Sequence, residues 1–227
     1  MCPSINIIDG RDVVFLDAVN GKDTNSGLWS YQAVKTLDRA LETIVNNCNR
    51  ALDTITDRVK FRDQRTIVVL SANNIYTTKI HTLTGIDLEV RSSNSPNWLF
   101  YENYINLVDS NVNISGVNIS VEGNASSAFR FSGKCSIYQR GTYTHLKKPL
   151  VVNAPPSNNF GRLDLTILSN EGNMGSDAKW VSSASSNAGV SVFVRCNANI
   201  TNINTSADNG VAIPASALIY KNVARVS

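Results

Sequence analysis

The sequence predicts a mainly β protein, a short right-handed parallel β-helix (a solenoid) with an N-terminal amphipathic capping helix. Three observations support this fold class. Helical periodicity occurs in one stretch, and short runs of alternating apolar and polar residues follow it. No further helix separates these runs, which excludes a doubly wound α/β sheet. Similar segments that start with Gly recur at irregular intervals, as in solenoids whose coils carry loops of variable length.

The helix is expected to begin near Lys35, with Thr36 as its N-cap or first-turn residue. The apolar residues that follow at three- and four-residue spacing share one face: Leu37, Ala40, Leu41, Ile44 and Val45. The pattern continues to residue 59, but the Asn-rich residues 46–49 interrupt it. We therefore expect one bent helix or two short ones, ending before Gln64.

Short β segments are expected after the helix, at residues 66–70, 86–90, 112–121, 129–131, 136–143, 163–168 and 190–194. Turn-forming residues separate them at 92–96, 122–126, 155–159 and 169–173. Strands of this kind suit a sandwich, a barrel or a solenoid. The solenoid is favoured by residues 111–121, which alternate regularly and place Gly116 where one flat strand turns into the next.

Length and charge restrict the function classes. A chain of 227 residues is long enough for one domain with a substantial core, and 17% charged residues is well below the usual quarter. A net charge of +3, with no basic run longer than Lys147 and Lys148, argues against nucleic-acid binding. The sequence shows neither a secretory signal nor about eighteen consecutive apolar residues, so we expect no membrane insertion and folding in a cytosol.

Residues 15–41 carry a resemblance to a known family. They contain a strand, the loop Asn20-Gly-Lys-Asp-Thr-Asn-Ser-Gly27 and the helical segment Lys35-Thr-Leu-Asp-Arg-Ala-Leu41. This arrangement resembles the opening of pectate-lyase-like right-handed β-helix proteins, in which a strand, an Asn- and Gly-rich loop and a helix close off the first coil. The rest of the chain is similar only in its Asn- and Gly-rich rungs, so the resemblance implies a fold more than a function.

Within that superfamily, proteins without an export signal are similar to phage tailspikes, tail fibres and other virion surface proteins, commonly homotrimers. The resemblance implies a structural, non-catalytic virion protein of a tailed phage, assembled in the bacterial host cytoplasm. It would be a tail fibre or spike component, or a capsid-decorating protein. The implied partners are further copies of the chain, other virion proteins and a host surface glycan. The expected domains are an N-terminal arm or anchor (1–12), a strand, loop and capping helix (13–64) and the β-helix rungs (65–227).

A polysaccharide hydrolase or lyase is the enzymatic alternative. Glycan-cleaving β-helices need two carboxylates at a set separation. Asp87 and Glu89 are expected on the same face of one strand, and Asp164 with Glu171 is placed to flank a groove. A solvated outer face explains the same residues, so we assign no catalytic residue and expect binding rather than catalysis.

A carbohydrate-binding module is the third alternative, and it depends on an aromatic cluster. The cluster consists of Trp98, Phe100, Tyr101 and Tyr104. Aromatic side chains are enriched at interfaces and stack on sugar rings, which makes these residues the candidate binding site. Packing in the core or between subunits explains the same pattern and is the interpretation that we favour.

No metal or cofactor is expected. Asp17, Asn20, Asp23 and Asn25 are oxygen donors in one loop, but the calcium-binding helix–loop–helix pattern is broken and no closing Glu follows, so turn formation is the simpler explanation. The cysteines lie far apart in no metal-binding spacing, so we expect free thiols, with two of them packed inside. These cysteines are Cys2, Cys48, Cys135 and Cys196, of which the last two are the buried pair.

Overall fold

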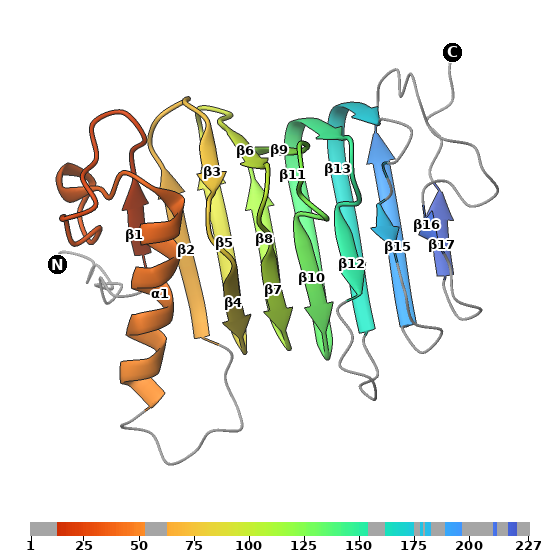
Figure 1. Cartoon of the computed structure of the whole chain (residues 1–227), viewed down its shortest axis with the longest axis horizontal. Helices are drawn as coiled ribbons and strands as arrows, with labels where there is room; N and C mark the ends of the chain where they lie inside the picture. Colours follow the sequence, from red (N-terminus) through yellow and green to blue (C-terminus); the bar gives the residue numbers. More distant parts are fainter. Residues whose placement is uncertain are drawn as a thin grey trace, which may run out of the picture.

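The structure is a computed structural model that describes residues 13–52, 63–153, 162–174, 178, 180–182, 189–196, 211–212 and 218–221. These residues form a mainly β fold of parallel sheets arranged as a β-solenoid of about 4 turns (Figure 1). The mainly β solenoid predicted from the sequence is therefore confirmed. The predicted arm, residues 1–12, lies outside the described residues.

The described elements follow one another as a strand, a short 3-10 helix, an α-helix and a series of short strands. In chain order they are β1 (Val13–Leu16), η1 (Ser30–Gln32), α1 (Leu37–Leu52), β2 (Asp63–Val69), β3 (Ile75–Thr77), β4 (His81–Thr84), β5 (Ile86–Ser92), β6 (Asn97–Phe100), β7 (Ile105–Val108), β8 (Asn111–Ser115), β9 (Asn118–Val121), β10 (Phe129–Ser132), β11 (Lys134–Leu146), β12 (Val151–Asn153), β13 (Arg162–Met174), β14 (Val181–Ser182), β15 (Gly189–Cys196), β16 (Val211–Ala212) and β17 (Leu218–Lys221).

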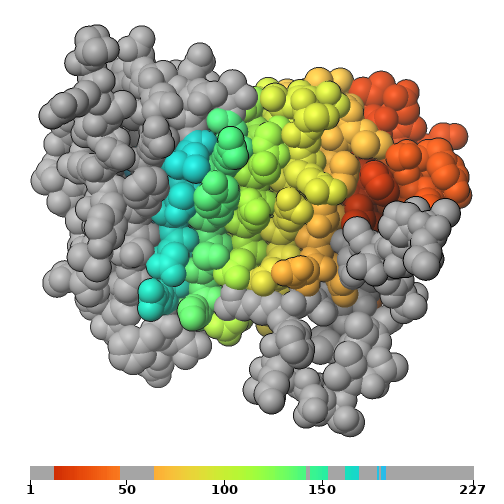
Figure 2. Space-filling view, turned by 180° about the vertical axis from the view of Figure 1, so that it is seen from behind, coloured from red at the N-terminus to blue at the C-terminus, as the bar shows by residue number. Residues whose placement is uncertain are grey.

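Corresponding strands of successive coils pair in parallel and form the sheets of the solenoid. One sheet has the order β1-β2-β5-β8-β11-β13-β15-β17, and a second has the order β16-β14-β12-β10-β7-β4. β3, β6 and β9 pair in sequence beside the first sheet and join it at the second half of β11. The chain thus passes through β2, β3 and β4 before it returns to place β5 against β2. Figure 2 shows the successive coils as neighbouring bands across one face of the molecule.

The coils stack in register on a repeat that varies slightly in length. Thr66 contacts Glu89, which lies 23 residues later, and Asp87 contacts Asn111, which lies 24 residues later. Asn111 in turn contacts Ser136, 25 residues further on. The paired residues stay in register from coil to coil while the number of residues between them varies, so the repeat is irregular in the sequence although the stack is regular.

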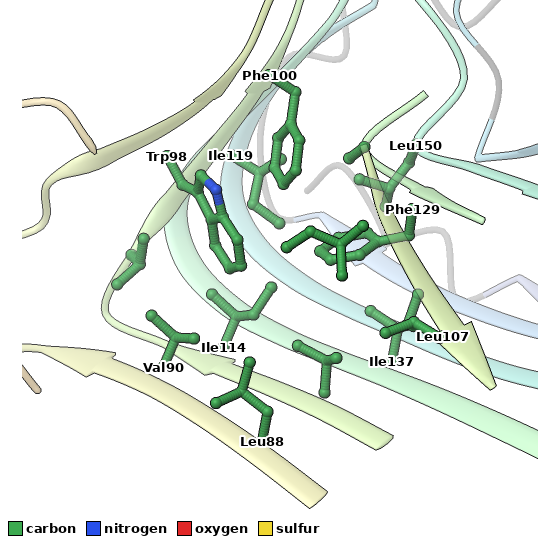
Figure 3. Close-up of a cluster of buried hydrophobic side chains, with 14 of the residues drawn as sticks. Leu88, Val90, Trp98, Phe100, Leu107, Ile114, Ile119, Phe129, Ile137 and Leu150 are labelled. Atoms are coloured by element: carbon green, nitrogen blue, oxygen red, sulfur yellow. The ribbon is translucent and has the colours of Figure 1, made fainter. Parts of the chain in front are cut away.

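The core lies inside the coils, where alternate residues of each strand point. Trp98, Phe100 and Phe129 form its aromatic centre and are all 0% exposed (Figure 3). The ring centroids of Trp98 and Phe100 are 5.0 Å apart, and Phe129 packs edge-on to both at 5.8 and 5.3 Å. Cys135 is buried among the aliphatic residues, as predicted for this thiol. Burial of each large side chain contributes roughly 1.5–3 kcal/mol.

The predicted β segments all contain strands, and Gly116 occupies the corner between β8 and β9 with a positive φ of 65°. Eight described strands were not predicted from the sequence: β3, β4, β6, β7, β12, β14, β16 and β17. Each has only 2 to 4 residues, too few to show a clear alternation. The predicted turn at residues 169–173 is wrong, since these residues belong to β13. Their backbone pairs in register with β11, and this ladder outweighs the turn propensity of the local sequence.

Helix α1 begins as predicted. The Thr36 hydroxyl accepts a hydrogen bond from the Arg39 amide at 3.2 Å, which makes Thr36 the N-cap. Of the two alternatives, a break into two helices at residues 46–49 is wrong, because α1 continues through them to Leu52. An Asn in a helix interior costs less than about 0.7 kcal/mol, which the apolar face of the helix offsets. The predicted continuation to residue 59 lies outside the described residues.

Helix α1 and the loop before it pack against the first strands of the stack. Leu37, Leu41 and Ile44 of α1 are fully buried in the core. The helix lies against the first strands of the coil (Figure 1). β1 is the edge strand at this end of the first sheet, and Phe15 on it bonds to the loop: its amide donates to the Gly27 carbonyl at 2.7 Å, and its carbonyl accepts from the Val34 amide at 2.9 Å. The strand edge at this end is thereby paired within the chain.

Two glycines with the same backbone conformation allow a matched test of coil packing. We expect Gly85→Ala to lower the free energy of unfolding by about 1 kcal/mol, because φ is 67° but nothing lies near an added Cβ. Gly116→Ala should cost roughly 3 kcal/mol or more, because its Cβ would overlap the Ser92 carbonyl oxygen of the adjacent coil. Urea unfolding measures both, and equal losses would contradict the close approach of the coils.

Candidate functional site

The aromatic cluster predicted as a binding site divides into a buried and an exposed half. Trp98 and Phe100 lie on β6 with their side chains in the core, and the Trp98 indole donates to the Thr77 hydroxyl at 2.9 Å. Their assignment to an exposed site is therefore wrong. Alternation along a short strand turned both residues inward, in line with the core packing that the sequence analysis favoured.

Tyr101 and Tyr104 follow β6 and lie at the surface, where they form what we call the Tyr101–Arg130 surface together with Arg130. Tyr101 is 52% exposed. The guanidinium carbon of Arg130 lies 3.7 Å from the centroid of the Tyr104 ring, and its Nη2 donates to Ser126 at 3.1 Å. This cation–π contact holds Arg130 and Tyr104 in one orientation. Tyr101 is thus the exposed member of the predicted aromatic site, and Tyr104 is half-buried with Arg130 over its ring.

Asp87 and Glu89 lie on the outer face of β5, on the same side as predicted. The Asp87 carboxylate accepts a hydrogen bond from the Asn111 amide at 2.8 Å, and the Asn111 amide oxygen accepts one from Ser136 at 2.7 Å. Glu89 accepts a bond from the Thr66 hydroxyl at 3.3 Å. Both carboxylates therefore take part in hydrogen bonds that connect one coil to the next.

The second predicted carboxylate pair lies on β13. Asp164 has a side chain that is 45% exposed, and its carboxylate is 3.7 Å from the Arg162 guanidinium. The side chain of Glu171 lies outside the described residues, and so does the groove predicted between the two. Asp164 is three inter-strand steps from Asp87 in the register, about 14 Å, which exceeds the separation of a glycosidase pair. Asp87 and Glu89 are about 7 Å apart along one strand, a separation within the range of a glycosidase pair.

The polar loop before η1 uses its four candidate metal ligands to hold its own shape. Asp17 accepts hydrogen bonds from the amides of Val19 and Asn20, at 2.9 and 3.1 Å, and from the Asn20 side chain at 3.2 Å. Partial burial raises the pKa of Asp17, but the bonds from Asn20 and Val19 outweigh this effect and the pKa is lowered. Asn25 donates to the Ala33 carbonyl at 2.9 Å.

Asp23 of the same loop fixes the start of α1. Its carboxylate accepts from the amides of Lys35 and Thr36, at 2.9 and 2.8 Å, and from the Thr36 hydroxyl at 2.9 Å. A negative charge at this position also interacts favourably with the helix dipole. Across the described residues, no group of three or more His, Cys, Asp and Glu side chains is arranged to hold a metal ion.

A buried polar cluster that the sequence did not predict lies between α1 and the first coil. Asp38 in the first turn of α1 is 4% exposed, and His81 at the start of β4 is 8% exposed. Their Oδ1 and Nε2 atoms are 2.6 Å apart, and the other carboxylate oxygen accepts bonds from the Thr78 hydroxyl and from the Thr78 amide, the latter at 3.1 Å. A single Asp and a single His carry no sequence signal for such a long-range contact.

The cluster contains the Asp, His and hydroxyl groups of a catalytic triad, but its hydrogen bonds connect them differently. In a nucleophilic triad the hydroxyl bonds to the His ring nitrogen that faces away from the carboxylate. Here the Thr78 hydroxyl bonds to the same carboxylate as His81. Burial by itself raises the pKa of Asp38, but the bonds from His81 and Thr78 outweigh it and lower the pKa. The arrangement anchors the charged form of Asp38 and ties the helix to the coil.

Comparison with known proteins identifies no family. No family model matches the chain, and neither a curated protein nor a solved structure matches it. No helix in the described part of the chain is long and apolar enough to cross a membrane. The functional conclusion therefore depends on the residues and on their geometry.

Two substitutions separate core packing from ligand contact in the aromatic cluster. Trp98→Ala should lower the free energy of unfolding by about 3–5 kcal/mol, because it leaves a cavity in the centre of the core. Tyr101→Ala removes a side chain that is 52% exposed and should cost less than about 1 kcal/mol. Urea unfolding of both variants makes the comparison, and a stable Trp98→Ala protein would contradict the core position of Trp98.

Asp38→Asn should lower the free energy of unfolding by about 1–3 kcal/mol at neutral pH, because Asn preserves the shape but loses the charge-assisted hydrogen bonds. The folded-state pKa of Asp38 lies below its ordinary value of 3.8, so the carboxylate stabilises the fold above that pH. This advantage over Asn is lost as the pH falls through the folded-state pKa. Urea unfolding at a series of pH values measures the difference.

Glu42→Gln is the matched control on the same helix, since it removes an exposed ion pair with Lys79, whose charged atoms are 2.8 Å apart. An exposed pair of this kind contributes little, so stability should hardly change. A loss as large as that of Asp38→Asn, or an Asp38→Asn deficit that persists unchanged in acid, would refute the anchoring role of the buried cluster.

Proposed function

We propose that this chain is a structural, non-catalytic protein of a tailed-phage virion, either a β-helical tail fibre or spike component or a capsid-decorating protein. The observation that carries the proposal is the in-register stack, in which side chains as well as backbone groups bond from coil to coil. A projection on a particle surface must resist bending and proteolysis, and a continuous stack of this kind supports both properties.

Two ladders of side-chain hydrogen bonds run along the stack. In one, the Asn97 amide donates to Asn74 at 3.0 Å, and the Asn118 amide donates to Asn97 at 3.1 Å. The other is the series Asp87, Asn111 and Ser136 described above. Each net hydrogen bond contributes only about 1 kcal/mol, but splaying two coils breaks the side-chain bonds and the backbone ladder together. The stack therefore favours a stiff body.

The finer features of the proposal come from the sequence. The resemblance of residues 15–41 supports a right-handed coil, a capping function for α1 and assembly as a homotrimer. Burial of the apolar face of α1 and pairing of the β1 edge by the preceding loop support the capping function, because an uncovered stack would expose core and strand edge. The proposed location is the virion, after assembly in the bacterial host cytoplasm, with other virion proteins as partners.

A polysaccharide-cleaving enzyme is the second candidate, and one observation favours it. Asp87 and Glu89 share an outer face at a separation compatible with an acid and a base acting through water. Against this, both carboxylates are engaged by neighbouring coils. A glycan-binding role is supported by the Tyr101–Arg130 surface, which places two tyrosines and a guanidinium at one corner of the coil.

Light scattering of the purified chain is expected to give the mass of three copies, because virion projections of the proposed class are trimeric. In the same preparation, prolonged digestion with a non-specific protease should leave residues 63–153 intact, since their backbone groups are held in continuous ladders. A monomer that is cleaved within these strands would contradict the proposal.

The enzymatic alternative is tested on the same material with capsular and lipopolysaccharide substrates. Turnover that Asp87→Asn or Glu89→Gln abolishes would replace the structural proposal with the enzyme. Asp164→Asn and Glu171→Gln test the second predicted pair in the same assay.

A further inference from the structure

Two large aromatic side chains project from the loop that covers the edge of β1. Trp29 is 58% exposed and Tyr31 is 77% exposed, although both carry large apolar surfaces. Their rings stack on each other at an interplanar angle of 15°, with centroids 6.2 Å apart. The two ring planes are thus nearly parallel, and most of the surface of each side chain is open to solvent.

The loop holds this pair in place before any ligand arrives. The Gly27 amide donates to the Gln32 carbonyl at 3.0 Å, and the Gln32 amide donates to the Trp29 carbonyl at 2.9 Å. The Ser26 hydroxyl donates to the Gln32 side-chain oxygen at 2.9 Å. Gly27 is itself bonded to β1, so the aromatic pair is mounted on the sheet and little conformational freedom would be lost on binding.

The segment that carries the pair is polar but uncharged. Residues 24–32 contain no Asp, Glu, Lys or Arg, and they offer the hydroxyls of Ser26 and Ser30 and the amide of Gln32. The remaining large apolar side chain of this segment, Leu28, is half-buried. Protein interfaces of standard size need about 800 Å² on each side, which two projecting rings do not supply.

We propose that Trp29 and Tyr31 form a binding platform for a neutral pyranose sugar. The apolar C–H face of such a ring stacks on an aromatic face, while its hydroxyls bond to neutral donors and acceptors at the rim. The uncharged segment favours a neutral sugar over an acidic one. This site is distinct from the Tyr101–Arg130 surface, and it requires neither a trimer nor a particle, so it stands or falls separately from the proposed function.

The three tryptophans of the chain give a direct readout. Trp98 is 0% exposed and Trp180 is 6% exposed, so Trp29 is the one that solvent and ligands reach. The native full chain is titrated, while its indole fluorescence is followed, with linear oligosaccharides of glucose, galactose, mannose and N-acetylglucosamine. We expect saturable quenching or a blue shift with at least one of these probes, and none with the monosaccharide salt glucuronate.

Variants assign the signal to the platform, with isothermal calorimetry as the readout where the fluorophore is removed. Trp29→Ala should weaken binding at least tenfold, Tyr31→Ala should weaken it measurably, and Trp29→Phe should retain most of the affinity because it keeps an aromatic face. Tyr76→Ala, at a tyrosine of β3 that is 47% exposed, is the matched control and should bind like the native chain.

Failure of every neutral oligosaccharide to bind, or binding that Trp29→Ala leaves unchanged, would overturn the proposal. A third result would also overturn it: a shift of Trp29 fluorescence on dilution that parallels a change in mass would identify the pair as a contact between copies of this chain. Because light scattering reports the assembly state independently, loss of the sugar site leaves the test of the virion proposal intact.

Discussion

Register between parallel strands is the constraint on which the rest of this structure depends. Each coil of the solenoid has few contacts of its own and gains its core, its backbone hydrogen bonds and its side-chain ladders from the coils above and below. A slip of one residue would turn inward-facing residues such as Trp98 and Ile114 toward solvent and would bring polar neighbours such as Asn97 and Asn113 into the core. Insertions are therefore tolerated at the corners, where the repeat length varies, and not within strands.

The same constraint destabilises the ends of the stack, because a terminal coil has a neighbour on one side only and its other side leaves apolar core and strand edge without partners. At the N-terminal end three features adjoin the first coil: a loop that bonds to β1, the apolar face of α1 packed into the core, and the buried contact of Asp38 with His81 and Thr78. The last of these fixes the helix in one position, since an unpaired buried carboxylate would cost several kcal/mol. The proposed capping function of α1 follows from this need.

Much of the fold was predictable from the sequence because periodicity is a local property. The face of α1, the N-cap Thr36 and the corner at Gly116 all depend on residues a few positions apart. Most of the strands of two to four residues, such as β3, β4, β6 and β7, were not predicted, because so few residues seldom define a period. The ladder through residues 169–173 was also hidden, since its stability comes from β11 rather than from its own turn-forming sequence.

The candidate site was less predictable than the fold, for a related reason. The aromatic cluster was visible as composition, but the inward direction of Trp98 and Phe100 was fixed by the position of a short strand. The Asp38–His81 contact joins residues 43 positions apart, and the exposed pair Trp29 and Tyr31 depends on a loop that turns both rings outward. Composition indicated which side chains were available, and only the stacked coil determined which of them meet.

A distance measured across the stack in solution tests the central claim most directly. Gln64 and Asp164 are far apart in the sequence but lie in one row of the register, which passes through Asp87, Asn111 and Ser136. Four inter-strand steps place their Cα atoms about 19 Å apart. Nitroxide labels on Gln64→Cys and Asp164→Cys, with accessible native cysteines replaced, should give one narrow distance distribution near this value by pulsed electron spin resonance. A broad distribution, or one centred at about twice that distance, would contradict the stacked coil.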